Sequence, residues 1–132
     1  MTPPATTHQP NILVMDDEPM TRKILQLCLE KDFGVVMKDD GMAGMAWIES
    51  GAPVDLVLAD LHMPHLNGKE FLSVLRSSNL YGDLPVIILS GSEESNERIQ
   101  CLELGADDFM TKPFNPQEVI AKVKAVLRRS RR

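Results

Sequence analysis

Five polar residues that suit phosphate or metal chemistry stand at the ends of short apolar runs in this chain. They are two adjacent carboxylates, a third carboxylate, a hydroxyl and an ammonium group: Asp16, Asp17, Asp60, Ser90 and Lys112. If the apolar runs are parallel strands, all five residues lie at one edge of a sheet. Ligands of open α/β sheets bind at the edge formed by the carboxyl ends of the strands. The sequence therefore predicts a functional site there.

This set of groups suits metal-assisted transfer of a phosphoryl group. Neighbouring carboxylates repel each other, and a divalent hard cation such as Mg²⁺ relieves the repulsion. A carboxylate beside Mg²⁺ can attack phosphorus and form an aspartyl phosphate. An ammonium group and a hydroxyl would then stabilise the charge on the transferring oxygens. Taken singly, the same residues are also ordinary helix caps, turn residues or exposed charges.

Asp60 is the best candidate for the attacking carboxylate. The preceding run, residues 54–59, is rich in Val and Leu, as expected for a strand that is covered on both faces. Pro64 lacks a backbone donor and ends the pairing soon afterwards. Asp60 is therefore expected at the carboxyl end of a buried strand, beside a loop.

The remaining chain alternates apolar runs with amphipathic stretches. The expected strands are residues 12–15, 35–37, 54–59, 86–89 and, less clearly, 108–111. The expected helices begin at Pro19, at Gly41, at Asn67, before Ile99 and at Pro116. Five strands alternating with five helices predict right-handed crossovers and a single doubly wound parallel sheet of the α/β class.

The helices also carry expectations about their faces and ends. The first helix should be closed by Gly34 and should bury one face, made of Ile24, Leu25, Cys28 and Leu29. The second helix should face inward through Ala43, Ala46 and Trp47. Ile99, Leu102 and Leu104 mark the fourth helix, and Gly105 suits the position just after it.

The last helix has the clearest start signal in the chain. Asn115 and Glu118 resemble a capping box, and Pro116 suits the first helical position. A buried stripe is expected along the helix, made of Val119, Ile120, Val123, Val126 and Leu127.

Length and composition predict one globular domain. The chain has 132 residues, 43% of them hydrophobic, which is enough for one core. Residues 1–10 contain three prolines and read as a disordered lead-in, residues 11–127 as the domain, and residues 128–132 as a basic tail or the start of a linker. No apolar run approaches the roughly 20 residues needed to span a bilayer. No signal peptide is seen, which predicts a cytoplasmic protein without membrane contact.

Charge and cysteine usage narrow the functional classes. The net charge is −5, and four of the 14 basic residues lie in the last five positions, so the body is strongly acidic. Four arginines on an acidic body attract nucleic acid only weakly, so nucleic acid is not expected as a partner of this domain alone. Cys28 and Cys101 lie in amphipathic segments, where a free thiol packs as a small hydrophobe.

The residues at the predicted edge resemble those of the response-regulator receiver domains of two-component signalling. The resemblance covers residues 11 to about 127, and the residues that carry it are Asp16, Asp17, Asp60, Met63, Pro64, Gly68, Ser90, Gly91, Gly105, Ala106, Lys112, Pro113 and Phe114. It implies a flavodoxin-like sheet with the strand order 2-1-3-4-5.

The family resemblance also implies a role for each site residue. Asp60 would accept a phosphoryl group from a phosphohistidine of a sensor histidine kinase or a phosphotransfer protein. Asp17, Asp60 and the backbone carbonyl of His62 would ligate Mg²⁺, and Asp16 would act through a water. Lys112 would pair with the phosphoryl oxygens, and the peptide bond between Lys112 and Pro113 is expected to be cis.

The expected output is a change of surface rather than turnover of a substrate. By the same resemblance, Ser90 and Phe109 form the switch, with Phe109 where many relatives have Tyr. The ring of Phe109 would move inward to fill space that Ser90 opens. A second copy of the domain, or a downstream partner or output domain, would then contact residues 93–104 and the outer side of residues 115–128. His62 and Ser92 occupy positions that tune phosphoryl lifetime in the family.

One alternative is a Mg²⁺-dependent phosphohydrolase with an aspartate nucleophile. Against it, no second acidic residue stands two positions after Asp60, and no insertion is long enough to cover a substrate. A metal site built from His8, His62 and His65 is disfavoured because their spacing is not of the zinc type.

Overall fold

A five-stranded parallel sheet with the order β2-β1-β3-β4-β5 forms the centre of the molecule. The computed structural model describes residues 9–91 and 95–130. The strands are β1 (Asn11–Met15), β2 (Gly34–Lys38), β3 (Leu56–Asp60), β4 (Val86–Ser90) and β5 (Asp108–Thr111). The fold class, the strand order and the five strands are as predicted, including the less certain fifth strand.

The strands are in register at their carboxyl ends. Met15 pairs with Ala59, Asp60 with Leu89, and Ser90 with Thr111. The last residues of β1, β3, β4 and β5 therefore lie along one edge, as the site prediction requires.

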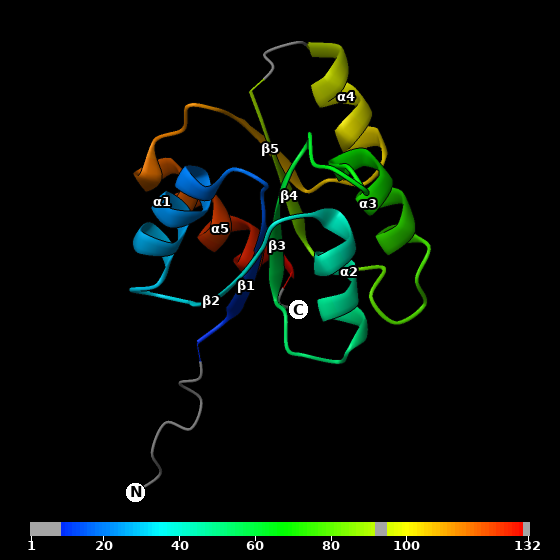
Figure 1. The fold of residues 1–132 in the computed structure, drawn as a ribbon, viewed down its shortest axis with the longest axis horizontal. Coiled ribbons are helices and arrows are strands. Elements are labelled where there is room, and N and C mark those ends of the chain that lie inside the picture. Colours follow the sequence, from blue (N-terminus) through cyan, green and yellow to red (C-terminus); the bar gives the residue numbers. More distant parts are fainter. Residues whose placement is uncertain (1–8, 92–94, 131–132) are drawn as a thin grey trace, which may run out of the picture.

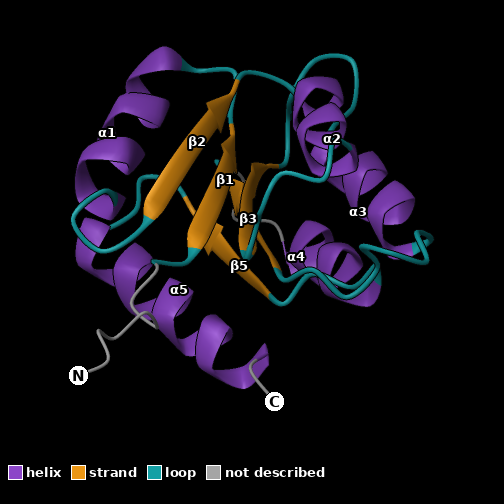
Figure 2. Ribbon diagram, turned by 90° about the horizontal axis from the view of Figure 1, so that it is seen from below, coloured by secondary structure: helices purple, strands orange, loops and turns teal. Residues whose placement is uncertain are grey.

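Five helices cover the two faces of the sheet (Figures 1 and 2). They are α1 (Pro19–Leu29), α2 (Gly41–Glu49), α3 (Gly68–Arg76), α4 (Ser95–Glu103) and α5 (Pro116–Ser130). Alternate residues of each strand point to opposite faces. In β1, Ile12 and Val14 belong to the core shared with α1 and α5, whereas Leu13 and Met15 belong to the core shared with α2, α3 and α4.

The first helix ends earlier than predicted. It stops at Leu29, and Gly34 is the first residue of β2 instead of the helix end. The chain needs the intervening residues to reverse direction, and Phe33 in this turn is itself buried. The buried face consists of Thr21, Leu25 and Leu29, while Ile24 is 40% exposed.

The predicted inward face of the second helix was wrong. Its buried residues are Gly41, Gly44, Met45 and Ile48, whereas Ala46 is exposed and Trp47 only half-buried. The physical reason is close packing on the sheet. A Cβ atom at Gly44 would lie 2.0 Å from the sulfur of Met15. The small residues therefore face the core, and the larger Trp47 lies at the side, with the Lys38 ammonium 4.8 Å from its ring centre.

The fourth helix ends as predicted and leaves apolar side chains in solvent. Gly105 follows it with φ of +109°, and the N–H of Ala106 donates to the carbonyl of Cys101. This is the Schellman arrangement, which favours glycine because of the positive φ. Cys101 is buried, whereas Ile99, Leu102 and Leu104 are 50%, 44% and 37% exposed.

Arg76, the last residue of α3, contacts four residues that lie before and after β4 in the sequence. Its guanidinium donates to the carbonyl of Gly105 from Nε at 3.0 Å and from a terminal nitrogen at 2.6 Å. It also donates to the carbonyls of Gly82 and Leu84 and pairs with Asp107 at 3.1 Å. The turn after α4 is thus fixed to the end of α3.

The last helix begins as predicted and continues beyond the predicted domain boundary at residue 127. Pro116 is its first residue, and the side chain of Asn115 accepts from the N–H of Gln117 instead of that of Glu118. The helix runs to Ser130, so Arg128 and Arg129 lie in its last turn. Residues 1–8 of the predicted lead-in and residues 131–132 of the predicted tail lie outside the described residues. None of the helices between residues 9 and 130 that the structure describes has the length and apolar character needed to cross a bilayer.

Candidate functional site

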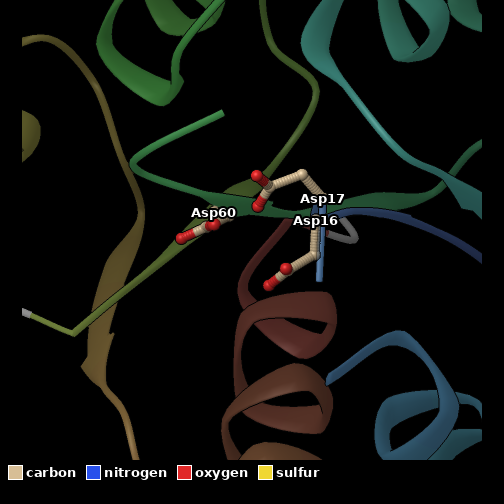
Figure 3. Close-up of side chains that lie close together, drawn as sticks. All are labelled: Asp16, Asp17 and Asp60. Carbon is tan, nitrogen blue, oxygen red and sulfur yellow. The ribbon is translucent and has the colours of Figure 1, made fainter. Parts of the chain in front are cut away.

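The structure brings the predicted site residues together at the carboxyl edge of the sheet. Asp60 is the last residue of β3, Ser90 is the last of β4, and Lys112 follows β5. Asp16 and Asp17 follow β1, and Figure 3 shows their side chains beside that of Asp60. One carboxylate oxygen from each aspartate lies within 4.8 Å of the other two.

Lys112 forms ion pairs with two of these carboxylates. Its ammonium nitrogen lies 2.9 Å from Oδ2 of Asp16 and 3.3 Å from Oδ1 of Asp60. Its backbone N–H donates to the carbonyl of Ser90 at 2.6 Å. The peptide bond from Lys112 to Pro113 is cis, as predicted.

Asp16 is fixed from the α1 side by contacts that the sequence did not reveal. Its Oδ1 accepts from the backbone N–H of Glu18 at 2.9 Å, and Arg22 donates to its backbone carbonyl at 2.7 Å. The hydroxyl of Thr21 donates to the carboxylate of Glu18. Asp16 is completely buried, whereas Asp17 is exposed. The start of α1 therefore orients one carboxylate and leaves the next one open to solvent.

The site carries an excess of negative charge in a partly desolvated place. Burial raises the pKa of Asp60 above its ordinary value, and the charge of Asp16 raises it further, although Lys112 and a backbone hydrogen bond with His62 oppose the shift. Burial alone would lower the pKa of Lys112, but its hydrogen bond to Asp16 and the charges of Asp60 and Asp16 outweigh this effect and raise it. One ammonium group thus compensates three carboxylates incompletely.

These residues fit a divalent hard cation. The donor set consists of carboxylate oxygens, which Mg²⁺ prefers. The pKa of Asp60 is raised first by burial and then by the charge of Asp16, and a bound cation would offset both effects. The exposed carboxylate of Asp17 gives solvent access, so waters can complete an octahedral shell. The acidic cluster could therefore hold a metal ion.

The two predicted switch residues lie on the neighbouring strands β4 and β5. Ser90 is completely buried at the end of β4, and Phe109 lies on β5 in register with Ile88. The ring of Phe109 is only 7% exposed and packs in the core shared with α3 and α4. Phe109 is therefore largely buried in this structure.

The histidines after Asp60 have carboxylate partners on two different helices. Nε2 of His62 lies 3.7 Å from Glu97 of α4, and Nδ1 of His65 lies 3.0 Å from Asp40 at the start of α2. Neither contact was predicted, because the partner residues are distant in the sequence. His8 and Ser92, which the sequence also singled out, lie outside the described residues.

We expect Asp60→Asn to unfold at a higher urea concentration than the wild type in metal-free buffer at pH 7. Because the folded-state pKa of Asp60 is raised, its ionised form costs stability at this pH. This cost disappears as the pH falls through the raised pKa towards the ordinary value of 3.8, so the gain of the variant should vanish in acid. Lys112 keeps Asp16 as its partner.

Urea titrations at several pH values, with and without Mg²⁺, check this expectation. Asp39→Asn is the matched control, because it makes the same change at an exposed position at the end of β2. Bound Mg²⁺ should stabilise the wild type by mass action and reverse the order of stability. A variant that is less stable than the wild type in metal-free buffer would contradict the electrostatic account.

Comparisons with known proteins agree with this geometry. The family model of the response regulator receiver domain matches residues 12–124. The chain is 42% identical over 120 residues to the alkaline phosphatase synthesis transcriptional regulatory protein PhoP of Bacillus subtilis, with 90% of this chain and 49% of that protein covered. It is 37% identical over 119 residues to the phosphate regulon transcriptional regulatory protein PhoB of Escherichia coli, covering 89% and 52%. The chain thus spans about half the length of the curated relatives it matches.

Solved structures show the same architecture. The receiver domain of the Francisella response regulator 1452 matches with a TM-score of 0.87 at 31% identity, covering 93% of this chain and all of that one. A response regulator of Chloroflexus aurantiacus also matches with a TM-score of 0.87, at 27% identity and 92% coverage of this chain. The curated relatives are named as transcriptional regulatory proteins, and the phosphohydrolase alternative is not favoured. The chain belongs to the response regulator receiver domain family.

Proposed function

We propose that Asp60 is the phosphoacceptor of this receiver domain. The observation that carries the proposal is the arrangement of three carboxylates around one ammonium group at the carboxyl edge of the sheet. Asp60 ends the buried central strand and is 6% exposed, so its carboxylate is fixed and faces the cluster. Positioning and electrostatic stabilisation are the main demands of phosphoryl transfer.

In the proposed reaction a carboxylate oxygen of Asp60 attacks the phosphorus of a phosphohistidine. The new P–O bond forms as the P–N bond breaks, and the leaving imidazole nitrogen takes the bonding electron pair. Lys112 already contacts Asp60 and would then pair with an oxygen of the transferred group, while retaining Asp16 as a second partner. Ser90 would donate its hydroxyl hydrogen to another oxygen of this group.

We propose that Mg²⁺ is the metal of this site and that it neutralises charge on the phosphoryl oxygens. Asp17, Asp60 and the backbone carbonyl of His62 would be its direct ligands. Asp16 would act through a water, because Lys112 and the N–H of Glu18 already occupy its two carboxylate oxygens.

The stoichiometry of the reaction with acetyl phosphate tests this function. A receiver domain should take up about one phosphoryl group per chain in a Mg²⁺-dependent reaction and lose it slowly. A phosphohydrolase would instead release many equivalents of phosphate without accumulating a phosphoprotein. Radiolabel incorporation and phosphate release, measured on the same sample, distinguish the two outcomes.

We propose that the phosphohistidine donor docks beside the first helix. A groove of about 480 Å³ opens there next to the site, lined by Glu18, Met20, Thr21, Ile24, Lys112, Pro113, Phe114 and Pro116. Met20 and Ile24 are 64% and 40% exposed, so apolar surface lies next to the acceptor. A sensor kinase or phosphotransfer protein that buries these side chains would bring its histidine to Asp60.

The proposed output surface lies on α4, β5 and α5. Ile99, Leu102 and Leu104 expose apolar area on or just after α4, and their burial would stabilise contact with a second copy or a downstream domain. The proposed contact region begins at residue 93, which lies outside the described residues. The relatives are named as transcriptional regulators, so we infer a transcriptional output. We also infer a cytoplasmic location, in accord with the free thiols of Cys28 and Cys101.

We expect Ser90→Ala to remain phosphorylatable but to lose most of the response of this surface. Ser90 would move towards the phosphoryl group and draw the following segment with it, and Phe109 would repack below. Beryllofluoride with Mg²⁺ mimics the aspartyl phosphate. Amide chemical shifts of residues 95–128 should change strongly in the wild type and much less in the variant. Equal changes in both proteins, or changes confined to α1, would contradict the proposed coupling.

A further inference from the structure

The loop that follows the acceptor is fastened to the start of α2 at two consecutive positions. This acceptor loop, residues 61–67, connects β3 to α3. Nδ1 of His65 lies 3.0 Å from Oδ2 of Asp40, the residue that caps α2. At the next position, Gly41 packs directly on the loop backbone, because a Cβ atom there would lie 2.1 Å from the carbonyl oxygen of Leu66.

His65 holds an unusual backbone conformation at this contact. Its φ is +70°, and among the described residues no other non-glycine has a positive φ. This left-handed region is unfavourable for residues with a Cβ atom, so it persists only where surrounding contacts stabilise it. The hydrogen bond to Asp40 is a side-chain contact made by this residue.

Asp40 is prepared for this role by its place at the helix start. Its Oδ1 accepts from the N–H of Ala43 at 2.8 Å, which leaves Oδ2 for the imidazole. Since a carboxylate can only accept, the hydrogen of this bond belongs to Nδ1 of His65. The hydrogen bond from Ala43 lowers the pKa of Asp40, and the bond with His65 lowers it further, so the Asp40 carboxylate stays ionised.

On the other side, the acceptor loop is connected to α4. His62 pairs with Glu97, and Lys69 at the start of α3 lies 3.6 Å from the same carboxylate. The loop therefore contacts the start of α2 on one side and α4 on the other. The contacts with Asp40 and Gly41 determine its position on the α2 side.

We propose that His65 and Asp40 are positioning residues for phosphoryl transfer, whose bond fixes the acceptor loop and thereby the carbonyl of His62. The proposal rests on the proposed function, in which that carbonyl is a ligand of Mg²⁺. The side chain of His65 is 68% exposed, so the bond adds little to global stability. Its effect is on the local order of the loop.

A double-mutant cycle with His65→Gly and Asp40→Ser tests the pair. Glycine accepts the positive φ without strain, and serine can still cap α2 but has no second oxygen for the imidazole. His65→Asn is the control for glycine flexibility, because asparagine also tolerates a left-handed backbone. Two quantities are measured in each protein: the hydrogen exchange rate of the Leu66 amide, which donates to the carbonyl of Pro64, and the dissociation constant for Mg²⁺.

Each single variant should speed exchange of the Leu66 amide at least fivefold and raise the dissociation constant for Mg²⁺ at least threefold, with a melting temperature close to that of the wild type. His65→Asn should behave as His65→Gly does. The double variant should resemble the single variants, because one interaction is removed only once. Additive effects or unchanged exchange would overturn the proposal, and faster exchange with unchanged Mg²⁺ binding would reduce the pair to a structural contact and overturn its positioning role.

Failure of the proposed function gives a different result. In that case the wild type would take up no label on Asp60 from acetyl phosphate, whatever the exchange rates of the loop show.

Discussion

Asp60→Asn should abolish labelling by acetyl phosphate, the largest effect that we expect from any single substitution in this chain. Asparagine keeps the size of the side chain but lacks the nucleophilic carboxylate. Asp16 cannot replace it, because Asp16 is completely buried and both its oxygens have partners. Asp17 is exposed, but it follows β1 and is not at the carboxyl end of the central strand β3.

The measurement is incorporation of acid-stable, base-labile label at saturating Mg²⁺, followed by mass spectrometry of the labelled peptide. Asp39→Asn, at the end of β2 and exposed, should be labelled like the wild type. Undiminished labelling of Asp60→Asn, mapped to another carboxylate, would exclude Asp60 as the acceptor.

Asp17→Ala should raise the dissociation constant for Mg²⁺ by about tenfold or more, which corresponds to about 1.4 kcal/mol. The loss follows from removal of a proposed direct ligand, and the fold should tolerate the change because Asp17 is exposed. Phosphorylation at low Mg²⁺ should slow in parallel and recover partly as the Mg²⁺ concentration rises.

Asp16→Asn is the appropriate partner variant for this experiment. Alanine at this position would leave the N–H of Glu18 and the ammonium of Lys112 without a buried partner, which would destabilise the fold and obscure the metal effect. Asparagine keeps an acceptor and should weaken Mg²⁺ binding less than Asp17→Ala does, because the proposed contact passes through a water. If calorimetric titration finds unchanged Mg²⁺ affinity in both variants, the acidic pair serves only to start α1.

The sheet and its functional edge were predictable because they depend on patterns that the sequence displays directly. A parallel strand covered on both faces needs a continuous apolar run, and the residue that ends such a run lies at the edge. This rule places Asp60 and Ser90, whereas Lys112 follows the short and less clearly apolar run of residues 108–111. The Schellman turn at Gly105 was predictable for a similar reason, since glycine is favoured where φ is positive.

The errors and omissions have a different physical origin. Side-chain hydrophobicity suggested Ala46 and Trp47 as the inward face of α2, but close packing on Met15 selected Gly44 instead. The contact between His65 and Asp40 joins residues 25 positions apart. The positive φ at His65 has no sequence signal, because the residue is not a glycine.

Arg76 has a further consequence for the way α4 can respond. Its two hydrogen bonds to the carbonyl of Gly105 immobilise the carboxyl end of this helix, while the amino end points towards the edge where Ser90 lies. A rigid rod held at one end can only rotate about that end. Displacements should therefore be smallest at Leu104 and grow by a constant increment per residue towards Ser95. The exposed side chains of Ile99, Leu102 and Leu104 would then tilt together with the helix instead of sliding as a unit.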